Sequence, residues 1–185
     1  MHSKLTTHSL IVMALFAALL CVSSYITISI PTGQHITLQN FFVLLVAFLF
    51  PMKQALLILF VWLLTGMIGI PVFAGGYAGI SYILSPLGGY SVAFLLIATL
   101  VPLLRGKKYN RTYFTILAIF SALLIDCFGA VWLMLLNQLS IKSAFLVGVI
   151  PYLPLDIVKA VIVAQIVPQF KRILVTNETG TLSDK

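Results

Sequence analysis

Three ionisable residues interrupt the long apolar stretches of this sequence: Asp126, Asp156 and Lys159. Insertion scales put the cost of such a residue within an apolar helix at about 2.5–3.5 kcal/mol, so each is a functional candidate. Asp156 and Lys159 are three residues apart, which places them on one face of a helix where they can pair. Pro151 and Pro154 precede them, so we expect the pair in the first turn of a helix, where free N–H groups favour anions. The pair could receive a small polar or anionic ligand, or it could only neutralise itself near the membrane surface.

Asp126 has no basic residue at helical spacing and is predicted deep within its helix. It could be protonated, hydrogen-bonded to a facing helix, or involved in proton coupling. The two cysteines, Cys21 and Cys127, lie in apolar runs without metal-ligand spacing, so they are interpreted as small core residues and no metal site is predicted. A small intramembrane enzyme using the three ionisable residues is the alternative from another class. It is disfavoured because the apolar runs carry no His or Cys cluster and no serine-based motif.

Glycine and aromatic residues form a second group of candidates, in the sequences GIPVFAGGYAG (69–79) and SPLGGY (85–90). Glycine lets the backbone approach a ligand closely or adopt a positive φ, and aromatic rings offer flat apolar faces. Uncharged irregular backbone is tolerated at membrane depth only where it is buried in protein or lines a cavity. We therefore predict a lid over a binding cavity on the same side as the ion pair, with tight helix packing as the alternative. The residues concerned are Phe73, Gly75, Gly76, Tyr77 and Tyr90.

The composition indicates that these residues lie in a membrane protein. Of 185 residues, 61% are hydrophobic and 8% are charged, whereas a soluble domain has about 45–50% apolar and about 25% charged residues. A spanning helix takes about 20 residues, so the length accommodates six or seven spans and no soluble ATPase domain. Any work driven by ATP would need a partner chain.

The predicted fold is an all-α membrane protein with six transmembrane helices and a Gly-rich outer loop between the third and fourth. Residues 1–175 are predicted to form one transmembrane substrate-binding domain, followed by a polar, disordered cytoplasmic tail over 176–185. A short helix is expected over 141–149. The six spans are predicted over residues 10–30, 37–50, 55–70, 88–104, 113–136 and 154–170.

The basic residues predict the orientation of these spans. The net charge is +7, and with six spans the basic residues fall on one side of the membrane almost without exception. The positive-inside rule then places both termini in the cytoplasm. Because these charges flank helix ends, we expect them to meet membrane lipid, and nucleic acid is not an expected partner. The nine residues on the cytoplasmic side are Lys4, Lys53, Arg105, Lys107, Lys108, Arg111, Lys171, Arg172 and Lys185, against Lys142 outside.

Several of these motifs, in this order, resemble the BioY family, the biotin-specific substrate-binding (S) components of energy-coupling factor (ECF) transporters. The resemblance covers roughly residues 10–172. Two departures concern the ligand site: SPLGGY (85–90) stands where the family usually has GPTGGY, and Leu155 stands where it usually has glycine. The motifs are GIPVFAGG (69–76), Gly79, GGY (88–90), Leu153-Pro154-x-Asp156-x-x-Lys159-Ala160, Thr37-Leu38-Gln39, and Gly129-x-x-Trp132-Leu133.

The resemblance implies a binding protein of the bacterial cytoplasmic membrane that is not an enzyme and carries no cofactor of its own. Biotin would be bound from outside under the loops after the first and third helices. Lys159 could meet an anionic or carbonyl oxygen of biotin, and Asp156 could accept from a ureido N–H. An S component for another vitamin or precursor is the nearest alternative. The expected substrate-binding residues are Gln39, Phe73, Gly75, Gly76, Tyr77, Tyr90, Asp156 and Lys159.

A partner-docking face is expected on the first helix, where Ala14 and Ala18 form a small-xxx-small pattern that lets another helix approach closely. The resemblance implies that this face contacts an EcfT-like transmembrane coupling protein carrying two ABC ATPase subunits. ATP would then be hydrolysed by the partners.

Overall fold

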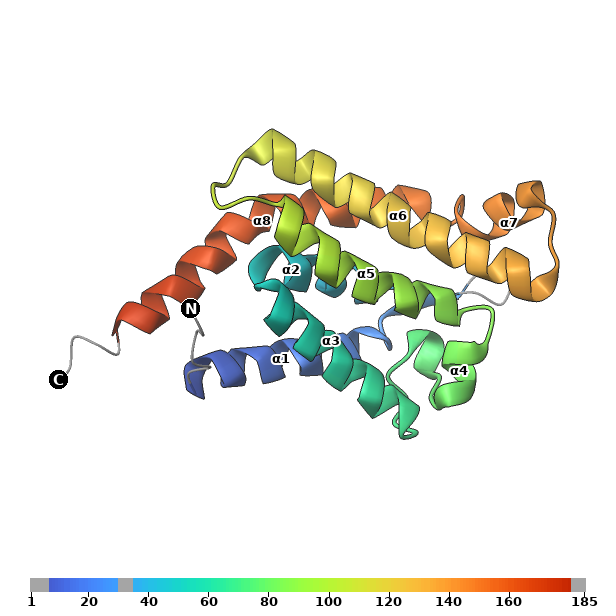
Figure 1. Cartoon of the computed structure of the whole chain (residues 1–185), viewed down its shortest axis with the longest axis horizontal. Coiled ribbons are helices and arrows are strands. Elements are labelled where there is room, and N and C mark those ends of the chain that lie inside the picture. Colours follow the sequence, from blue (N-terminus) through green and yellow to red (C-terminus); the bar gives the residue numbers. More distant parts are fainter. Residues whose placement is uncertain (1–6, 30–34, 181–185) are drawn as a thin grey trace.

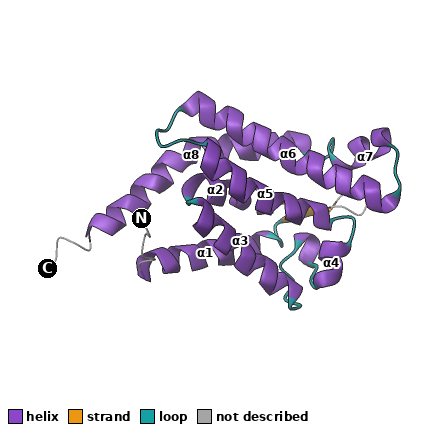
Figure 2. Ribbon diagram, in the orientation of Figure 1, coloured by secondary structure: helices purple, strands orange, loops and turns teal. Residues whose placement is uncertain are grey.

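The computed structural model of the chain describes residues 7–29 and 35–180, and within the last helix it describes side chains up to Ile173. This part of the chain is mostly helical, with eight α-helices, one 3-10 turn and one small antiparallel sheet (Figures 1 and 2). The elements are α1 (Thr7–Ser23), β1 (Thr27–Ser29), β2 (His35–Thr37), α2 (Gln39–Leu49), α3 (Met52–Met67), η1 (Ala74–Gly76), α4 (Ile80–Leu84), α5 (Gly88–Leu104), α6 (Arg111–Asn137), α7 (Ile141–Gly148) and α8 (Leu153–Gly180).

Helix α2 forms the centre of the molecule. Its residues from Val43 to Phe48 are at most 2% exposed, and it packs against α1, α3, α5 and α8. A helix that is apolar all round is stable when other helices surround it, which explains why this run has no polar face. Helix α6 lies along α5 and α8 and carries α7 against it.

The outer helices present apolar side chains to their surroundings. Ile11, Phe60, Ile116, Leu135 and Val158 are all more than 50% exposed, and so extensive an apolar surface is unusual for a soluble protein. Helix α6 and the Leu153–Ile173 part of α8 are long and apolar enough to cross a membrane, and α1, α2, α3 and α5 are shorter apolar helices.

The two ends of the molecule differ in what they carry. Figure 1 shows both termini at one end, together with the connection between α5 and α6, while α4 and α7 lie at the opposite end. That connection contains Lys107 and Lys108, flanked by Arg105 and Arg111. One end of the helical bundle is therefore basic.

The prediction of a helix over 10–30 is wrong beyond Ser23. Helix α1 ends at Ser23, where the Ser23 and Ser24 hydroxyls donate to the carbonyls of Leu20 and Cys21 (2.7 and 2.8 Å). The β-branched residues that follow form β1, which pairs antiparallel with β2. Such hydroxyl bonds to preceding carbonyls compete with helix continuation, and β-branched residues favour the strand. The fold is thus helical with one small sheet, and Thr37, expected in the second span, belongs to β2.

Other boundaries also differ from the predictions. The 71–90 segment is partly ordered into η1 and α4. Helix α8 continues to Gly180, so residues 176–180, expected to be disordered, are helical. No helix-breaking residue stands between Pro168 and Gly180, and glycine commonly ends a helix. Residues 181–185 of the predicted tail lie outside the described residues. In contrast, α5 has the predicted bounds, and α6 and α7 differ from theirs by at most two residues.

Candidate functional site

The ion pair at the start of α8 is formed. Lys159 Nζ lies 2.7 Å from Asp156 Oδ1, and the Asp156 side chain is 2% exposed. The three-residue spacing puts both groups on one face of α8, as the sequence predicted. Because a buried carboxylate needs partners to offset its lost hydration, this pair is part of a larger network.

That network connects α8 to two elements near the beginning of the chain. Asn40, in the first turn of α2, donates from Nδ2 to Asp156 Oδ2. Lys159 Nζ also donates to the Thr37 carbonyl of β2, at 2.7 Å. Asp156 therefore has a partner on each oxygen, and Lys159 fastens the sheet to α8.

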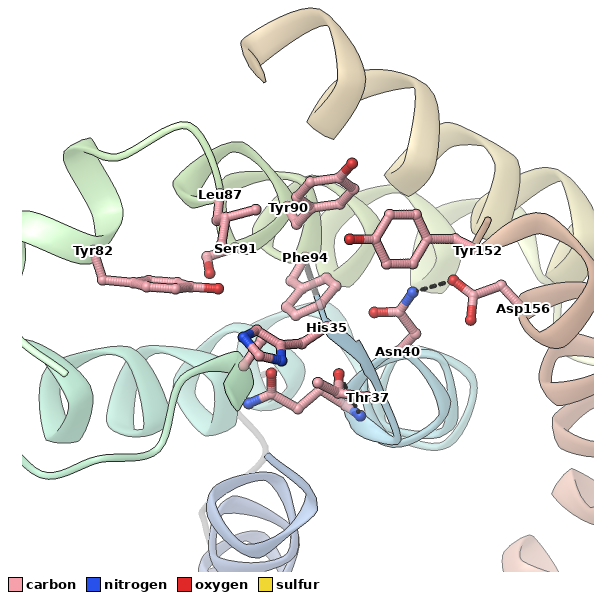
Figure 3. A pocket seen from close by; sticks show the side chains of 12 residues that line it. His35, Thr37, Asn40, Tyr82, Leu87, Tyr90, Ser91, Phe94, Tyr152 and Asp156 are labelled. Carbon is pink, nitrogen blue, oxygen red and sulfur yellow. Dashed lines mark hydrogen bonds between the residues drawn. The ribbon is translucent and has the colours of Figure 1, made fainter. Parts of the chain in front are cut away.

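A narrow cavity lies beside this network, at the end of the molecule opposite the termini. Figure 3 shows Tyr82 reaching in from one side, with Tyr152, Asp156 and Asn40 on the other. The lining combines polar side chains with apolar rings, as in ligand sites that orient a partly apolar molecule. The lining residues are His35, Thr37, Gln39, Asn40, Ala74, Tyr82, Leu87, Tyr90, Ser91, Phe94, Tyr152 and Asp156.

Tyrosine hydroxyls supply much of the polar character of the cavity. Burial raises the pKa of both Tyr82 and Tyr152, so both phenols stay neutral and can donate or accept a hydrogen bond. The Tyr90 hydroxyl donates to the Gly148 carbonyl at 2.8 Å, and its ring centroid lies 5.5 Å from that of Tyr152. Tyr90 thus ties α5 to the end of α7 while its ring lines the cavity.

The cavity is small, about 30 Å³, but it adjoins a wider one of about 470 Å³. Tyr82 and Leu87 line both, so these two side chains form the wall between them. The wider cavity lies among α4, the end of α6 and α7, and Ser81, Ser85 and Asn137 are among its polar lining residues. Ligand pockets are typically about 300–1,000 Å³; the volume of the wider cavity lies in this range, and that of the narrow cavity is far below it.

The structure brings only some of the predicted site residues to the cavity. Gln39, Tyr90 and Asp156 line it. Gln39 also connects α2 to the segment after α3, because its Nε2 donates to the Val72 carbonyl at 2.8 Å. Lys159 does not line the cavity and acts through Asp156.

In the Gly-rich segment 69–79, Ala74 lines the narrow cavity, but the predicted residues Phe73, Gly75, Gly76 and Tyr77 do not. Phe73 is fully buried, stacked on Tyr82 at 4.7 Å, so it belongs to the core. Tyr77 is half exposed, with its ring 5.8 Å from that of Tyr82. Gly75 has φ +76°, and a Cβ there would lie 2.6 Å from the His35 ring. Gly76, at φ +78°, completes the same tight turn.

Sequence reasoning missed Asn40, Tyr152 and Tyr82, among others. Asn40 follows Gln39 at the start of an apolar run, so two adjacent amides in that position were an available signal. Tyr152 stands within Pro-Tyr-Leu-Pro (151–154), which only Leu155 separates from Asp156. Tyr82 gave no signal, because only the turn at α4 brings it to the cavity.

The predicted docking residues lie elsewhere. Ala14 and Ala18 are both exposed on α1, while Met13, Phe16 and Ala17 on the other face of the helix are buried. The small face of α1 is therefore accessible in the described part of the chain.

Comparison with known proteins gives a consistent result. The model of the BioY family matches residues 1–176. The chain is 36% identical over 158 residues to "Biotin transporter BioY2" of Lactococcus lactis, covering 84% of this chain and 86% of that one. It is 38% identical over 147 residues to "Probable biotin transporter BioY" of Pyrococcus horikoshii, covering 80% and 86%.

A solved structure shares the fold. The crystal structure of "the S-component for biotin from an ECF-type ABC transporter" matches with a TM-score of 0.81 and 23% identity, covering 93% of this chain and 95% of that one.

Proposed function

This chain belongs to the BioY family, and on that premise we propose that it is the biotin-binding S component of an ECF-type ABC importer. It is a transport protein of the membrane and not an enzyme, as its relatives are transporters. The observation that carries the proposal is the buried Asn40–Asp156–Lys159 network beside a cavity walled by aromatic rings. Biotin combines a ureido ring, which needs polar partners, with an apolar thioether ring and an anionic chain.

Within this proposal, Asp156 is the group that accepts a hydrogen bond from a ureido N–H. Its carboxylate lines the cavity, whereas the ammonium of Lys159 is held by Asp156 and the Thr37 carbonyl. Lys159 then holds the Asp156 carboxylate in place. Gln39 and Tyr90 line the cavity directly. Ala74 and Tyr82 would contact the ligand, and their positions depend on packing with Phe73, Gly75, Gly76 and Tyr77.

Entry of biotin requires displacement of Tyr82 and Leu87. Their movement would join the narrow cavity to the wider one, giving a space within the usual range for a ligand of this size. The wider cavity lies at the end opposite the termini, which is the outer end in the proposed orientation.

Purified protein should bind radiolabelled biotin saturably, with displacement by unlabelled biotin and not by thiamine or riboflavin. Of these three vitamins, biotin alone has a saturated cyclic urea with two ring N–H groups, one of which would donate to the Asp156 carboxylate. The measurement is equilibrium binding in detergent or nanodiscs, with Asp156→Leu as the variant that removes the acceptor and Lys142→Ala as the control on an exposed surface. Displacement by another vitamin would mean that the proposed ligand is wrong, whereas the proposed site and topology would stand. Absence of any biotin binding would contradict the proposed function.

The proposed topology has six spans, α1, α2, α3, α5, α6 and α8, with both termini in the cytoplasm of a bacterial cell. It is supported by the position of the basic α5–α6 connection at the same end as both termini (Figure 1). The segment between α3 and α5, which contains η1 and α4, would then face outward. The short α2 is compatible with this topology because it is buried among other helices and does not meet lipid alone.

Single cysteines test this topology in a background lacking Cys21 and Cys127. Ile80→Cys, at a position 62% exposed at the start of α4, should react with a membrane-impermeant thiol reagent on intact cells. Ile80 is preferable to Gly79, whose φ of +88° a cysteine would strain. Lys108→Cys should react only after lysis. Reaction of Lys108→Cys in intact cells would reverse the orientation and with it the external access of biotin.

For transport, the proposed partners are an EcfT-like coupling protein and two ABC ATPase subunits, with ATP hydrolysed by the latter. The exposed small face at Ala14 and Ala18 supports docking through α1, since small side chains let two helices approach closely within a bilayer. Membrane lipid covers the remaining apolar surface.

A further inference from the structure

Asp126 is a buried acid that the ligand network described above does not use. It is fully buried within α6, on a stripe where Ala122, Gly129 and Ala130 are also buried. Neither of its carboxyl oxygens has a hydrogen-bond partner in the described part of the chain. A carboxylate left in this condition within a membrane helix would be costly.

The groups around Asp126 come from each side of α6. Helix α8, which carries Asp156 and Lys159, packs along α6, and both residues are close enough to affect the charge of Asp126. Tyr90 of α5, Tyr152 before α8 and Cys127 on α6 are the other titratable neighbours. Close approach on the α5 side depends on Gly129, since a Cβ there would lie 2.2 Å from the Tyr90 ring. Asp126 therefore sits behind the ligand network, on the α6 side.

The charge balance of this group is uneven if all its members are ionised. Two carboxylates would face one ammonium, and that ammonium already donates to Asp156 and to the Thr37 carbonyl. Two ionised carboxylates offer only acceptors, so no hydrogen bond can join them. One proton between them removes the excess charge and makes the bond, as in other sites where two carboxyl groups lie close together.

We propose that Asp126 is a positioning residue of the ligand site, which holds a proton and donates it in a hydrogen bond to the Asp156 carboxylate. Asp156 then receives Lys159, Asn40 and Asp126 as donors. A carboxylate has about four lone-pair sites, so one remains for an N–H of the ligand. The buried group becomes neutral overall, and Asp156 is fixed on three sides by α8, α2 and α6.

The proton on Asp126 has a direct spectroscopic test that needs no ligand. Infrared spectra of the purified protein should contain the C=O stretch of a protonated carboxylic acid, and this band should be missing from Asp126→Asn. Ser121→Ala removes another buried polar group of α6, bonded only to the Leu117 carbonyl, and should keep the band. A band that persists in Asp126→Asn, or is absent from the unmodified protein, would overturn the assignment.

The positioning role, which rests on the proposed function, is tested by biotin affinity. Asp126→Asn keeps a donor and should bind within about threefold of the unmodified protein, whereas Asp126→Leu, of similar size but without a donor, should bind at least tenfold more weakly. Affinity of the unmodified protein should fall as alkaline pH removes the proton, and the Asn variant should lose less. Equal affinity of the Leu variant would overturn the positioning role. If the unmodified protein binds no biotin but shows the infrared band, the proposed ligand is wrong and the proton assignment stands.

Discussion

Replacement of Lys159 by alanine should weaken biotin binding at least tenfold, about 1.4 kcal/mol. The Lys159 ammonium is 2.7 Å from Asp156 Oδ1, and its removal leaves a carboxylate that is almost fully buried with one fewer donor. Loss of one partner from a buried ion pair also costs about 3–5 kcal/mol of folding stability, so the variant should unfold at a lower temperature.

The measurement is a biotin titration of the purified variant, with thermal unfolding recorded in parallel. Lys142→Ala removes a lysine from the exposed start of α7 and should leave affinity unchanged. Lys159→Arg restores a cation and should recover part of the affinity. An unchanged affinity in Lys159→Ala would show that Lys159 contributes to biotin binding neither directly nor through Asp156.

Tryptophan at Ala14 or Ala18 should abolish energised biotin uptake while biotin binding to the isolated protein survives. Both alanines are exposed on α1, and a large ring there prevents the close helix approach that small residues allow. The ligand cavity involves no residue of α1. A defect confined to uptake would therefore locate the docking face and separate it from the ligand site.

The control for this experiment is Ile116→Trp, a substitution on the exposed surface of α6, where Ile116 is 62% exposed. It places an equally large ring on an apolar face that no partner is proposed to contact, so uptake should continue. Uptake is measured in cells that express the coupling protein and ATPases, and complex formation by co-purification. Normal uptake by both Ala14→Trp and Ala18→Trp would contradict the proposal that α1 docks onto the coupling protein.

The sequence alone was sufficient for features that depend on neighbours along the chain. The Asp156–Lys159 pair follows from helical spacing, and the bounds of α5 follow from Gly88 and from the polar residues that begin at Arg105. Local spacing could not reveal Asn40, because its partner Asp156 is 116 residues away. Nor could local spacing show that Phe73, which was predicted to bind the ligand, packs in the core against Trp62 and Tyr82.

The misassigned residues share a physical cause. In an apolar sequence, hydrophobicity does not distinguish a helix from a short strand, so the segment after Ser23 was assigned to the helix. Its conformation is decided by pairing with His35–Thr37 and by the Lys159 bond to Thr37. The Tyr82–Leu87 wall is likewise set by the turns around α4, which depend on contacts with α3 and α5.

The long sequence separation within the ligand network has a consequence for biogenesis. Thr37 and Asn40 are synthesised early, but their partners Lys159 and Asp156 follow 122 and 116 residues later. In the proposed six-span topology, the first five spans can enter the bilayer while Asp156, the proposed acceptor for the ligand, is still in the ribosome. Polar groups at the start of α2 must wait in that interval without their final partners. The proposed ligand site is therefore completed only when the last helix is inserted. A nascent chain stalled before α8 would be inserted in the membrane but unable to bind the vitamin.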